Sequence, residues 1–527
     1  MQPIALPMPY QGIYDRLPAI AVQNPFCQYL LNFNISPAGL TLRNGDDAYF
    51  YRDTGATTSQ IVKFAKYGDT SLFTVEKDTA LNTNRVVDTS SGVVVHTFGA
   101  AYATSFATLF FNNNLFIFPD RLSIADGVRY DGTTWAASTY TSASGRLPFG
   151  GTVYKNRAYL LAKNRASYMY TEINAIAGAL NDVDLQTVIE EKGILYGICT
   201  INIADATSSE QYLVFLFSTG EVLFYQGSYP SSSDWRLVSR SSISPPLGYD
   251  TFISYQGDTL VVTTSGLISL RDLFLQGSQG ALSLSISKNI TQLWSDTINS
   301  QVATYGHAYN ALVSIVWNAL QNTIIVSFPY YIDPITGTYD TTTFLPTFFI
   351  FNTELGAWTL HRTLNIDYGD LVVMQDMIEF NGMIYYLVAA DLNTNGKYTV
   401  YKKEARTDFQ DDTPDNSGAS VSYDFYVQSA PITQNNGYVN KVQGMDVILE
   451  SDLSATTEYT LIKELGVDET SAQKVTFGSG IQKPFVNLGI EGTYVQYKIS
   501  GTTAASKTVG LDLYGVNIWQ DQGASPR

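Results

Sequence analysis

The segment from Asp391 to Gly396, Asp-Leu-Asn-Thr-Asn-Gly, is where the chain comes nearest to a metal-binding motif. Oxygen-bearing side chains stand at positions 1, 3 and 5 and a glycine at position 6, as in a calcium-binding loop. Position 12 is Lys402, however, where that loop needs a bidentate Glu. Because Asn-Gly is typical of a tight hairpin turn, we expect a turn here and no metal.

The segment from Tyr130 to Trp135, Tyr-Asp-Gly-Thr-Thr-Trp, is similar to the Asp-box turn of sialidase propellers. That motif needs one residue between its Asp and its Gly, whereas Asp131 and Gly132 are adjacent. A sialidase also needs an arginine cluster for the carboxylate of its substrate, and nothing near this segment indicates one. We therefore expect an ordinary turn.

Paired carboxylates are a further source of acid–base chemistry. The two acids of a glycoside hydrolase need only meet in space, so the sequence leaves such a pair open. The adjacent acids Glu190-Glu191 and Asp411-Asp412 are typical of solvated surface charge, and the setting of His361 favours a strand residue over a catalytic base. The chain has no Gly-x-Ser-x-Gly elbow, phosphate-binding glycine loop or His-Glu-x-x-His motif. We expect no enzyme, with no catalytic, cofactor-binding or metal-binding residues and no cofactor.

The composition argues against several classes of protein. The 527 residues carry a formal net charge of −17, and only 15% of them are charged. A protein that grips nucleic acid needs clustered Lys and Arg, which this balance disfavours, although nucleic acid could still slide past it. The two cysteines (Cys27, Cys199) and three histidines (His96, His307, His361) lie far apart, so they predict neither a disulfide framework nor a zinc site.

We expect no membrane-spanning segment and no secretion signal. The longest apolar stretches, such as 212–217 and 348–351, have the length of strands and fall well short of the ~20 residues that a bilayer needs. The first basic residue is Arg16, and prolines at 3, 7, 9 and 18 interrupt the apolar N-terminal region. These features predict a protein that folds in a cytoplasm.

The elements that must position any site are predicted to be strands. The chain has 36 Tyr, 27 Phe and 6 Trp, and aromatic residues suit pleated, half-buried surfaces. Helical spacing is plausible only at 98–109, 171–185 and 287–298. Everywhere else, short aromatic and β-branched runs alternate with Asn-Gly, Asp-Gly and Ser-Gly turns, which is the pattern of an all-β protein.

Seven hairpins share one pattern, in which an aromatic residue precedes a polar turn and an apolar run follows; they lie at 66–75, 111–118, 154–161, 217–225, 255–262, 317–326 and 380–386. Their recurrence fits β-propeller blades of about 40–50 residues. We predict about seven blades, with six to eight compatible; the alternative is a sandwich or barrel with unrelated hairpins. Two further hairpins, Arg129 to Trp135 and Phe351 to Trp358, place a turn between an aromatic residue and a Trp.

The composition changes near residue 410 and divides the chain. We expect an N-terminal arm or ring-closing strand at 1–45, a β-propeller-like domain at 46–407, an acidic linker at 408–420 and a β-sandwich-like domain at 421–527.

The opening Met1-Gln-Pro-Ile-Ala-Leu-Pro-Met-Pro-Tyr10, with Leu30-Leu31-Asn32 after it, resembles the tail nozzle or tail-stabilisation proteins of short-tailed bacteriophages. The resemblance continues in the strand, turn and Gly-x-Trp of 348–359 and in the β-rich end up to Ile518-Trp519. It spans the whole chain in order, but no single motif is diagnostic.

This resemblance implies a structural virion protein made in the host cytoplasm. Such proteins form a homohexameric ring beneath the portal and adaptor proteins, extend the channel for double-stranded DNA, retain the genome until ejection and anchor tail fibres or spikes. They have no set of catalytic residues to carry over. An acidic ring repels phosphates, so DNA would pass without specific binding.

Two other classes of protein stay open. A propeller-fold carbohydrate-active enzyme or lectin would bring acids together in a central pocket and stack Tyr and Trp on sugar rings. A receptor-binding fibre or spike would be a trimer, although the sequence has neither β-helical repeats nor heptads.

Overall fold

The computed structural model describes residues 2–521 with internal gaps. The segments outside the description, besides both ends, are 16–25, 54–58, 79–82, 99–102, 104, 121–126, 205–208, 278–284, 306–312, 329–346, 363–371, 391–396, 407–409, 413–419, 431, 434–439, 452–455, 464–467, 470–472, 477–479, 484, 493 and 504–510. The calcium-loop-like segment and His307 therefore lie outside the described residues.

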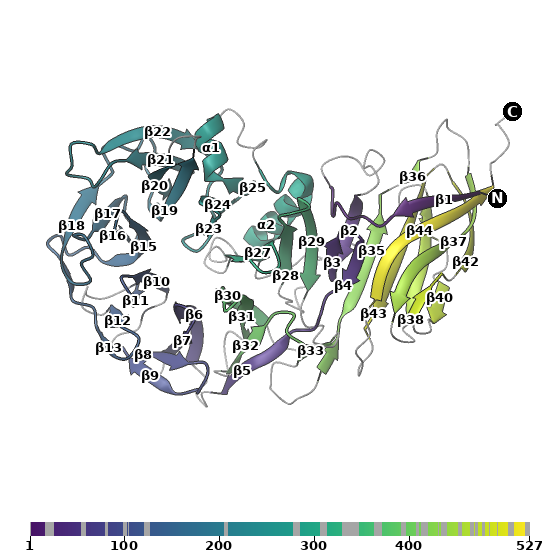
Figure 1. Ribbon diagram of the computed structural model, residues 1–527, viewed down its shortest axis with the longest axis horizontal. Helices are drawn as coiled ribbons and strands as arrows, with labels where there is room; N and C mark the ends of the chain where they lie inside the picture. Colours follow the sequence, from purple (N-terminus) through teal and green to yellow (C-terminus); the bar gives the residue numbers. More distant parts are fainter. Residues whose placement is uncertain are drawn as a thin grey trace.

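Seven sheets surround a central opening, as Figure 1 shows. The prediction of an all-β propeller of about seven blades with a β-sandwich-like domain is confirmed. The seven blades, each written from its innermost strand outward, are β6 (Ser59–Tyr67), β7 (Ser71–Asp78), β8 (Thr83–Asp88), β9 (Val94–Thr97); β10 (Phe106–Phe111), β11 (Asn114–Pro119), β12 (Val128–Tyr130), β13 (Trp135–Ala137); β15 (Pro148–Tyr154), β16 (Arg157–Ala162), β17 (Ser167–Tyr170), β18 (Gly178–Asp184), β14 (Tyr140–Ser142); β19 (Leu195–Ala204), β20 (Ser209–Phe217), β21 (Glu221–Gln226), β22 (Arg236–Ser242); β23 (Phe252–Tyr255), β24 (Asp258–Thr263), β25 (Gly266–Ser269); β26 (Ser314–Asn318), β27 (Thr323–Phe328), β28 (Thr347–Asn352), β29 (Ala357–Arg362); and β30 (Val372–Phe380), β31 (Met383–Ala390), β32 (Lys397–Lys402), β5 (Asp47–Asp53).

Each of the seven predicted hairpins belongs to a different blade. Six of them join the innermost two strands, and the hairpin at 217–225 joins β20 to β21 instead. The aromatic–turn–Trp pattern is also confirmed, since Tyr130 pairs with Trp135 and Phe351 with Trp358 in antiparallel register. The ring centroids of Tyr130 and Trp135 lie 4.7 Å apart, so the stacked pair closes the outer hairpin of its blade.

The apolar core of the ring lies between neighbouring blades. Each interface has its own buried cluster; for example, Phe64 of β6 packs with Phe380 and Tyr398 of the last blade. Central strands are buried on both faces and therefore read as continuous apolar runs, as in Arg157–Ala162, where every residue is buried. Stacking the blades side by side thus accounts for the recurrent aromatic pattern of the sequence.

The last blade closes the ring with β5, which pairs antiparallel with β32. The ring-closing strand therefore lies at 47–53 and not within 1–45, where the prediction placed it. Arg52 of β5 forms an ion pair with Glu76 of the first blade, and Tyr398 of β32 donates a 2.6 Å hydrogen bond to the same carboxylate. The closure is non-covalent and crosses from the last blade to the first.

The remaining N-terminal strands belong to the sandwich, which lies beside the ring in Figure 1. Residues 1–45 therefore do not form a separate arm: their short apolar strands are buried between C-terminal ones. One sheet contains β1 (Gln2–Pro7), β3 (Phe33–Ser36), β4 (Gly39–Leu42), β37 (Asn440–Ser451), β41 (Gly480–Gln482), β42 (Phe485–Gly492) and β44 (Leu511–Asp521). The other contains β2 (Cys27–Leu31), β35 (Asp424–Ser429), β36 (Ile432–Thr433), β38 (Thr456–Lys463), β39 (Asp468–Glu469), β40 (Gln473–Thr476) and β43 (Tyr494–Thr502).

The sandwich is continuous with the ring. Strand β2 pairs with β35 on one side and makes a parallel contact with β29 on the other, at Leu31 and Leu360. Within the predicted linker, β33 (Gln410–Asp412) pairs with β34 (Ser420–Ser422), so the prediction of an open linker is wrong for these residues.

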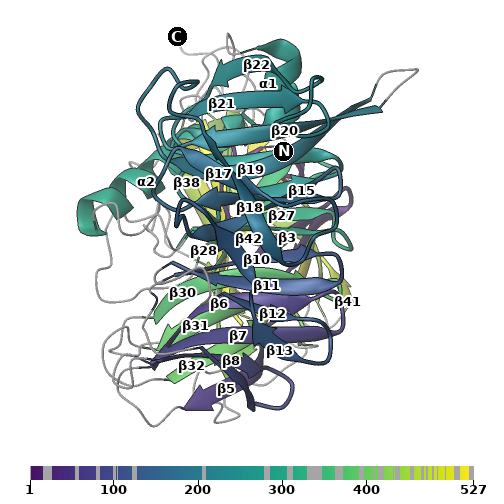
Figure 2. The same cartoon turned by 90° about the vertical axis from the view of Figure 1, so that its left-hand side faces the viewer.

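Only one of the three predicted helices is present. The segment 287–298 forms η4 (Lys288–Ile290) and the start of α2 (Thr291–Tyr305), while α1 (Leu270–Gln276) was not expected. Figure 2 shows α2 projecting from one face of the ring. The segment 171–185 contains β18, and 98–109 contains β10 where it is described, because pairing with neighbouring strands outweighs a short helical spacing. Among the described residues, no helix is long and apolar enough to cross a membrane.

Candidate functional site at the centre of the ring

The innermost strands surround a pocket of about 210 Å³ at the centre of the ring. It lies toward the end at which these strands begin, since Ser314 and Phe149 are at or near the starts of β26 and β15. Six of the seven blades contribute to its lining. The polar and aromatic side chains among the lining residues are Lys63, Thr108, Phe149, Tyr249, Asp250, Phe252, Ser314 and Asp376.

An ammonium group shared by two carboxylates forms the charged part of the pocket. The Lys63 Nζ atom lies 3.0 Å from Asp250 Oδ2 and 3.2 Å from Asp376 Oδ1. Asp376 is buried and accepts two further hydrogen bonds, from the Phe64 amide at 2.8 Å and from the Ser314 hydroxyl at 3.2 Å. The Asp250 side chain is 42% exposed, so it is the carboxylate that a ligand can reach.

Burial and charge act in opposite directions on this group. Burial raises the pKa of Asp376, and the Lys63 ammonium and the Phe64 amide oppose that rise. Burial also disfavours the charge on Lys63, but Asp250 and Asp376 outweigh it and raise the pKa of the ammonium. Lys63 therefore stays charged and binds the two acids to each other.

Irregularities in the strands place these side chains. The register shifts between Ile61 and Lys63 in β6, and between Met374 and Asp376 in β30. A third shift in β15 ends at Gly151, where an added Cβ would lie 1.9 Å from the Tyr159 carbonyl oxygen. Bulges re-aim side chains and are common beside functional sites, so three of them at one level mark a specifically shaped pocket.

Two larger pockets lie between the third and fourth blades, one at each end of the ring. The pocket near the β15–β16 turn has a volume of about 620 Å³ and contains Arg157, whose guanidinium lies 4.6 Å from the centre of the Tyr229 ring and pairs with Glu172 at 2.9 Å. The pocket at the opposite end, near the β16–β17 turn, has about 1150 Å³ and contains Glu190 and Glu191. Neither brings together a recognisable set of catalytic groups.

The acidic pairs predicted as surface charge have two outcomes. Glu190 and Glu191 are exposed, and their backbone amides donate to the Glu221 carboxylate, so the prediction is confirmed for them. It is wrong for Asp411, which is completely buried beside Arg43.

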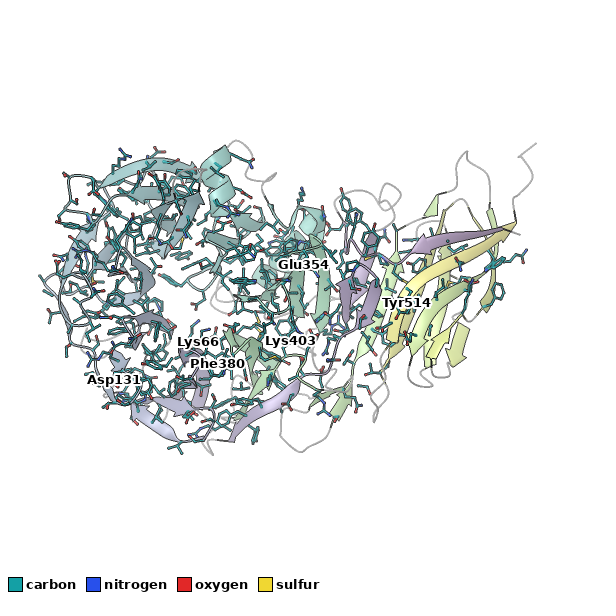
Figure 3. All side chains as sticks on the ribbon, in the orientation of Figure 1. Lys66, Asp131, Glu354, Phe380, Lys403 and Tyr514 are labelled. Atoms are coloured by element: carbon teal, nitrogen blue, oxygen red, sulfur yellow. The ribbon has the colours of Figure 1, made fainter. Side chains whose placement is uncertain are left out.

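The Asp-box-like segment forms a turn, as predicted. Asp131 Oδ1 accepts hydrogen bonds from the Thr133 and Thr134 amides at 2.9 and 2.8 Å and from the Thr133 hydroxyl at 2.8 Å. The amides make the largest contribution to lowering the Asp131 pKa to about 2. Figure 3 shows Asp131 at the outer rim of the ring, far from the central pocket.

A second group of charges is buried where the ring meets the sandwich, and Arg43 is its centre. Its guanidinium makes two hydrogen bonds to the Asp411 carboxylate at 2.9 and 2.7 Å and one to the Asn32 side chain at 3.1 Å. The carbonyls of Asn44 and Arg362 accept the remaining two, at 2.8 and 2.9 Å. All five N–H donors of Arg43 are therefore satisfied inside the protein.

His361 lies beside this group, in the strand β29, as predicted for a strand residue. Its Nε2 lies 3.2 Å from the Phe33 carbonyl oxygen, and its Nδ1 lies 3.2 Å from both Lys403 Nζ and Glu404 Oε1. Burial, followed by the Lys403 charge, lowers the pKa of His361 to about 4. Figure 3 shows Lys403 between the ring and the sandwich. The neutral imidazole is thus a structural group and has no exposed edge for catalysis.

Comparisons with known proteins give similarity in solved structures alone. No family model matches the chain, and no curated protein does. The β-propeller domain of Cps50 (Swd1) from Myceliophteria thermophila is similar with a TM-score of 0.40 and 10% identity, covering 68% of this chain and 99% of that one. The computationally designed Ika8 protein has a TM-score of 0.37 and 9% identity, with coverages of 71% and 96%. YCF48 bound to D1 peptide has 0.35 and 10%, with 68% and 97%.

Similarities at this level carry no conclusion about what the chain does. The architecture stands on the strand pairing itself: this is a seven-bladed β-propeller protein with a β-sandwich built from both ends of the chain.

Proposed function

We propose that this chain is a structural subunit of a short-tailed bacteriophage tail, a nozzle protein that assembles as a six-fold ring beneath the portal and adaptor. The ring would extend the DNA channel, retain the genome until ejection and anchor fibres or spikes. The proposal rests on the resemblance of the sequence described above and on the mechanical character of the fold.

The observation that best supports this role is the rigid union of propeller and sandwich. One sheet runs from the blade containing β29 through β2 into the sandwich, and the fully satisfied Arg43 lies beside it. Buried, hydrogen-bonded ion pairs permit few alternative arrangements, so the angle between the two parts is held. A subunit that resists the pressure of packaged DNA needs this kind of stiffness.

The charge distribution is compatible with DNA passing through the ring. The chain has 48 acidic and 31 basic residues, and several of the basic ones form internal ion pairs, including Lys63, Lys66 and Arg43. Paired cations are less available to phosphates, and the excess of acids repels them. DNA would therefore move along such a wall with little binding.

One observation favours a second candidate, a carbohydrate-active enzyme. Asp250 and Asp376 meet at the central pocket, as a pair of catalytic carboxylates would. However, Lys63 neutralises both, and each oxygen of Asp376 already accepts a hydrogen bond. A polysaccharide cleavage assay on the purified chain decides this alternative.

The copy number in purified virus particles, measured by quantitative peptide mass spectrometry against the portal protein, tests the nozzle proposal. We expect six copies for every ring of portal subunits. Absence from particles would refute the proposal, and a multiple of three per spike site would assign the chain to receptor binding instead.

A further inference from the structure

We propose that the central pocket binds one neutral sugar ring, or a polyol of similar size, and holds it without cleaving it. This ligand site is independent of the nozzle role, because it depends only on groups inside one propeller. The argument combines the shape of the pocket, its size and the kinds of polar group that it presents.

The shape requires unusual backbone features that stability alone does not need. The bulges before Lys63 and Asp376 interrupt the ladders of two strands, and Gly150 has a positive φ of 72°. An added Cβ on Gly150 would come within 3.1 Å of the Ala107 Cβ atom. Such departures weaken a sheet locally, so their convergence at the wall of one cavity indicates that the cavity itself is the product.

The size limits the ligand to a single ring. A volume of about 210 Å³ corresponds to about seven water molecules at ~30 Å³ each. This is smaller than the roughly 300–1,000 Å³ of ordinary drug-sized sites. A pyranose ring displaces about this amount of water, whereas an oligosaccharide or nucleotide does not fit inside.

The polar groups match hydroxyls, which both donate and accept. Asp250 offers a carboxylate that is 42% exposed, and the Ser314 hydroxyl and Lys63 ammonium lie next to it. Phe252 and Tyr249 add aromatic surface, and Tyr249 is held by a 3.1 Å hydrogen bond from its hydroxyl to Asn164 Oδ1. This mixture of carboxylate and aromatic surface suits the polar edge and the apolar face of a sugar ring.

The arrangement of charge disfavours ionic ligands and catalysis. An anion would meet Asp250, and a cation would compete with Lys63 for the same carboxylates. A general acid must release its proton to the substrate, but Asp376 is bonded through both oxygens to Lys63, Ser314 and the Phe64 amide. Asp250 alone cannot supply the two carboxyl roles of glycoside hydrolysis.

The test is a ligand-observed NMR titration of the purified full chain with glucose, galactose, mannose and N-acetylglucosamine, and with choline and gluconate as charged probes. A ligand of this size is expected to bind with a Kd on the order of 1 mM. Asp250→Asn removes the accessible charge and should weaken binding at least about tenfold. Thr108→Trp should fill the pocket and abolish binding. Asp234→Asn, in the pocket between the third and fourth blades, is the matched control and should change nothing.

The proposal is overturned if no neutral sugar binds, if only choline or gluconate binds, or if Asp250→Asn binds as well as the unmodified chain. Release of nitrophenol from the corresponding nitrophenyl glycosides would overturn the claim that the sugar is not cleaved. Because Asp250 is partly exposed, its variant is expected to fold, and it keeps the test decisive if Thr108→Trp does not. Failure here leaves the copy number in virus particles unaffected, so the two proposals are tested separately.

Discussion

Replacing Arg43 by Met should destabilise the joint between ring and sandwich more than any surface substitution does. The methionine approximates the length of the arginine stem but removes five hydrogen-bond donors and one charge. Asp411, which has 0% exposure, would lose both of its guanidinium bonds and remain buried. Its other bond, from the Asp46 amide at 2.9 Å, does not neutralise the carboxylate.

Breaking a buried ion pair by removing one partner costs about 3–5 kcal/mol. For a chain of 527 residues that unfolds as one unit, the entropy of unfolding is about 1.1 kcal/mol per kelvin, from ~2.1 cal/mol/K per residue. The loss therefore corresponds to a fall in Tm of about 3–5 °C. If the sandwich unfolds separately, the same energy falls on fewer residues and its own transition shifts further.

Differential scanning calorimetry measures this change. The matched control is Arg146→Met, because the partner of Arg146 is Asp184, whose side chain is 47% exposed and 3.0 Å away. Surface pairs contribute under about 1 kcal/mol, so the control should shift the Tm by at most about 1 °C. The double variant Arg43→Met, Asp411→Leu should regain part of the loss, since it removes the unpaired charge. If Arg43→Met unfolds within 1 °C of the control, the reasoning about this buried pair is refuted.

Two other perturbations test the same region. Since the pKa of His361 is lowered to about 4 from the usual 6.5, the unfolded chain binds a proton that the folded one rejects as pH falls from 6.5 toward 4. Stability should drop by up to about 3 kcal/mol over this window; calorimetry at stepped pH should show a shallower fall for His361→Gln, and equal slopes would contradict the assignment. Gly45→Ala would place a Cβ 1.8 Å from the Gln410 carbonyl oxygen, displacing β33 at a cost of about 2–3 kcal/mol. Gly145→Ala, which faces open space, should cost about 1 kcal/mol from its left-handed backbone alone, and equal losses of Tm would argue against the close approach.

Local patterns in the sequence were enough to predict the blades. Tyr130 and Trp135 are five residues apart and pair directly, so the hairpin that joins them is visible in the sequence. A third such pair, Tyr225 and Trp235, stacks at 5.3 Å but was missed, because its longer connection hides the pattern. The register of each hairpin follows from its own turn, which is why the number of blades could be inferred without any long-range information.

The joint and the central pocket could not be predicted in the same way. Arg43 and Asp411 are separated by 368 positions, and Asp411 stands in an acidic stretch that resembles surface charge. The three charges of the pocket come from different blades and meet only when the ring closes. One signal was nevertheless present: Lys63 and Asp376 each interrupt the middle of an otherwise apolar innermost strand. A charge at that position is costly unless it has a partner across the ring.

The placement of the paired charges follows from the problem of closing a ring made of similar parts. All blade interfaces are apolar, and apolar surfaces of similar shape discriminate poorly among partners. The first and last blades are joined instead by three ion pairs: Lys63 with Asp376, Lys66 with Glu379 at 2.8 Å, and Arg52 with Glu76. Figure 3 shows Lys66 and Phe380 side by side at this seam. Any other pairing of blades would leave these charges buried without partners at a cost of several kcal/mol each. The charges therefore select the one closure in which the two ends of the ring meet in register, while apolar burial supplies most of the stability.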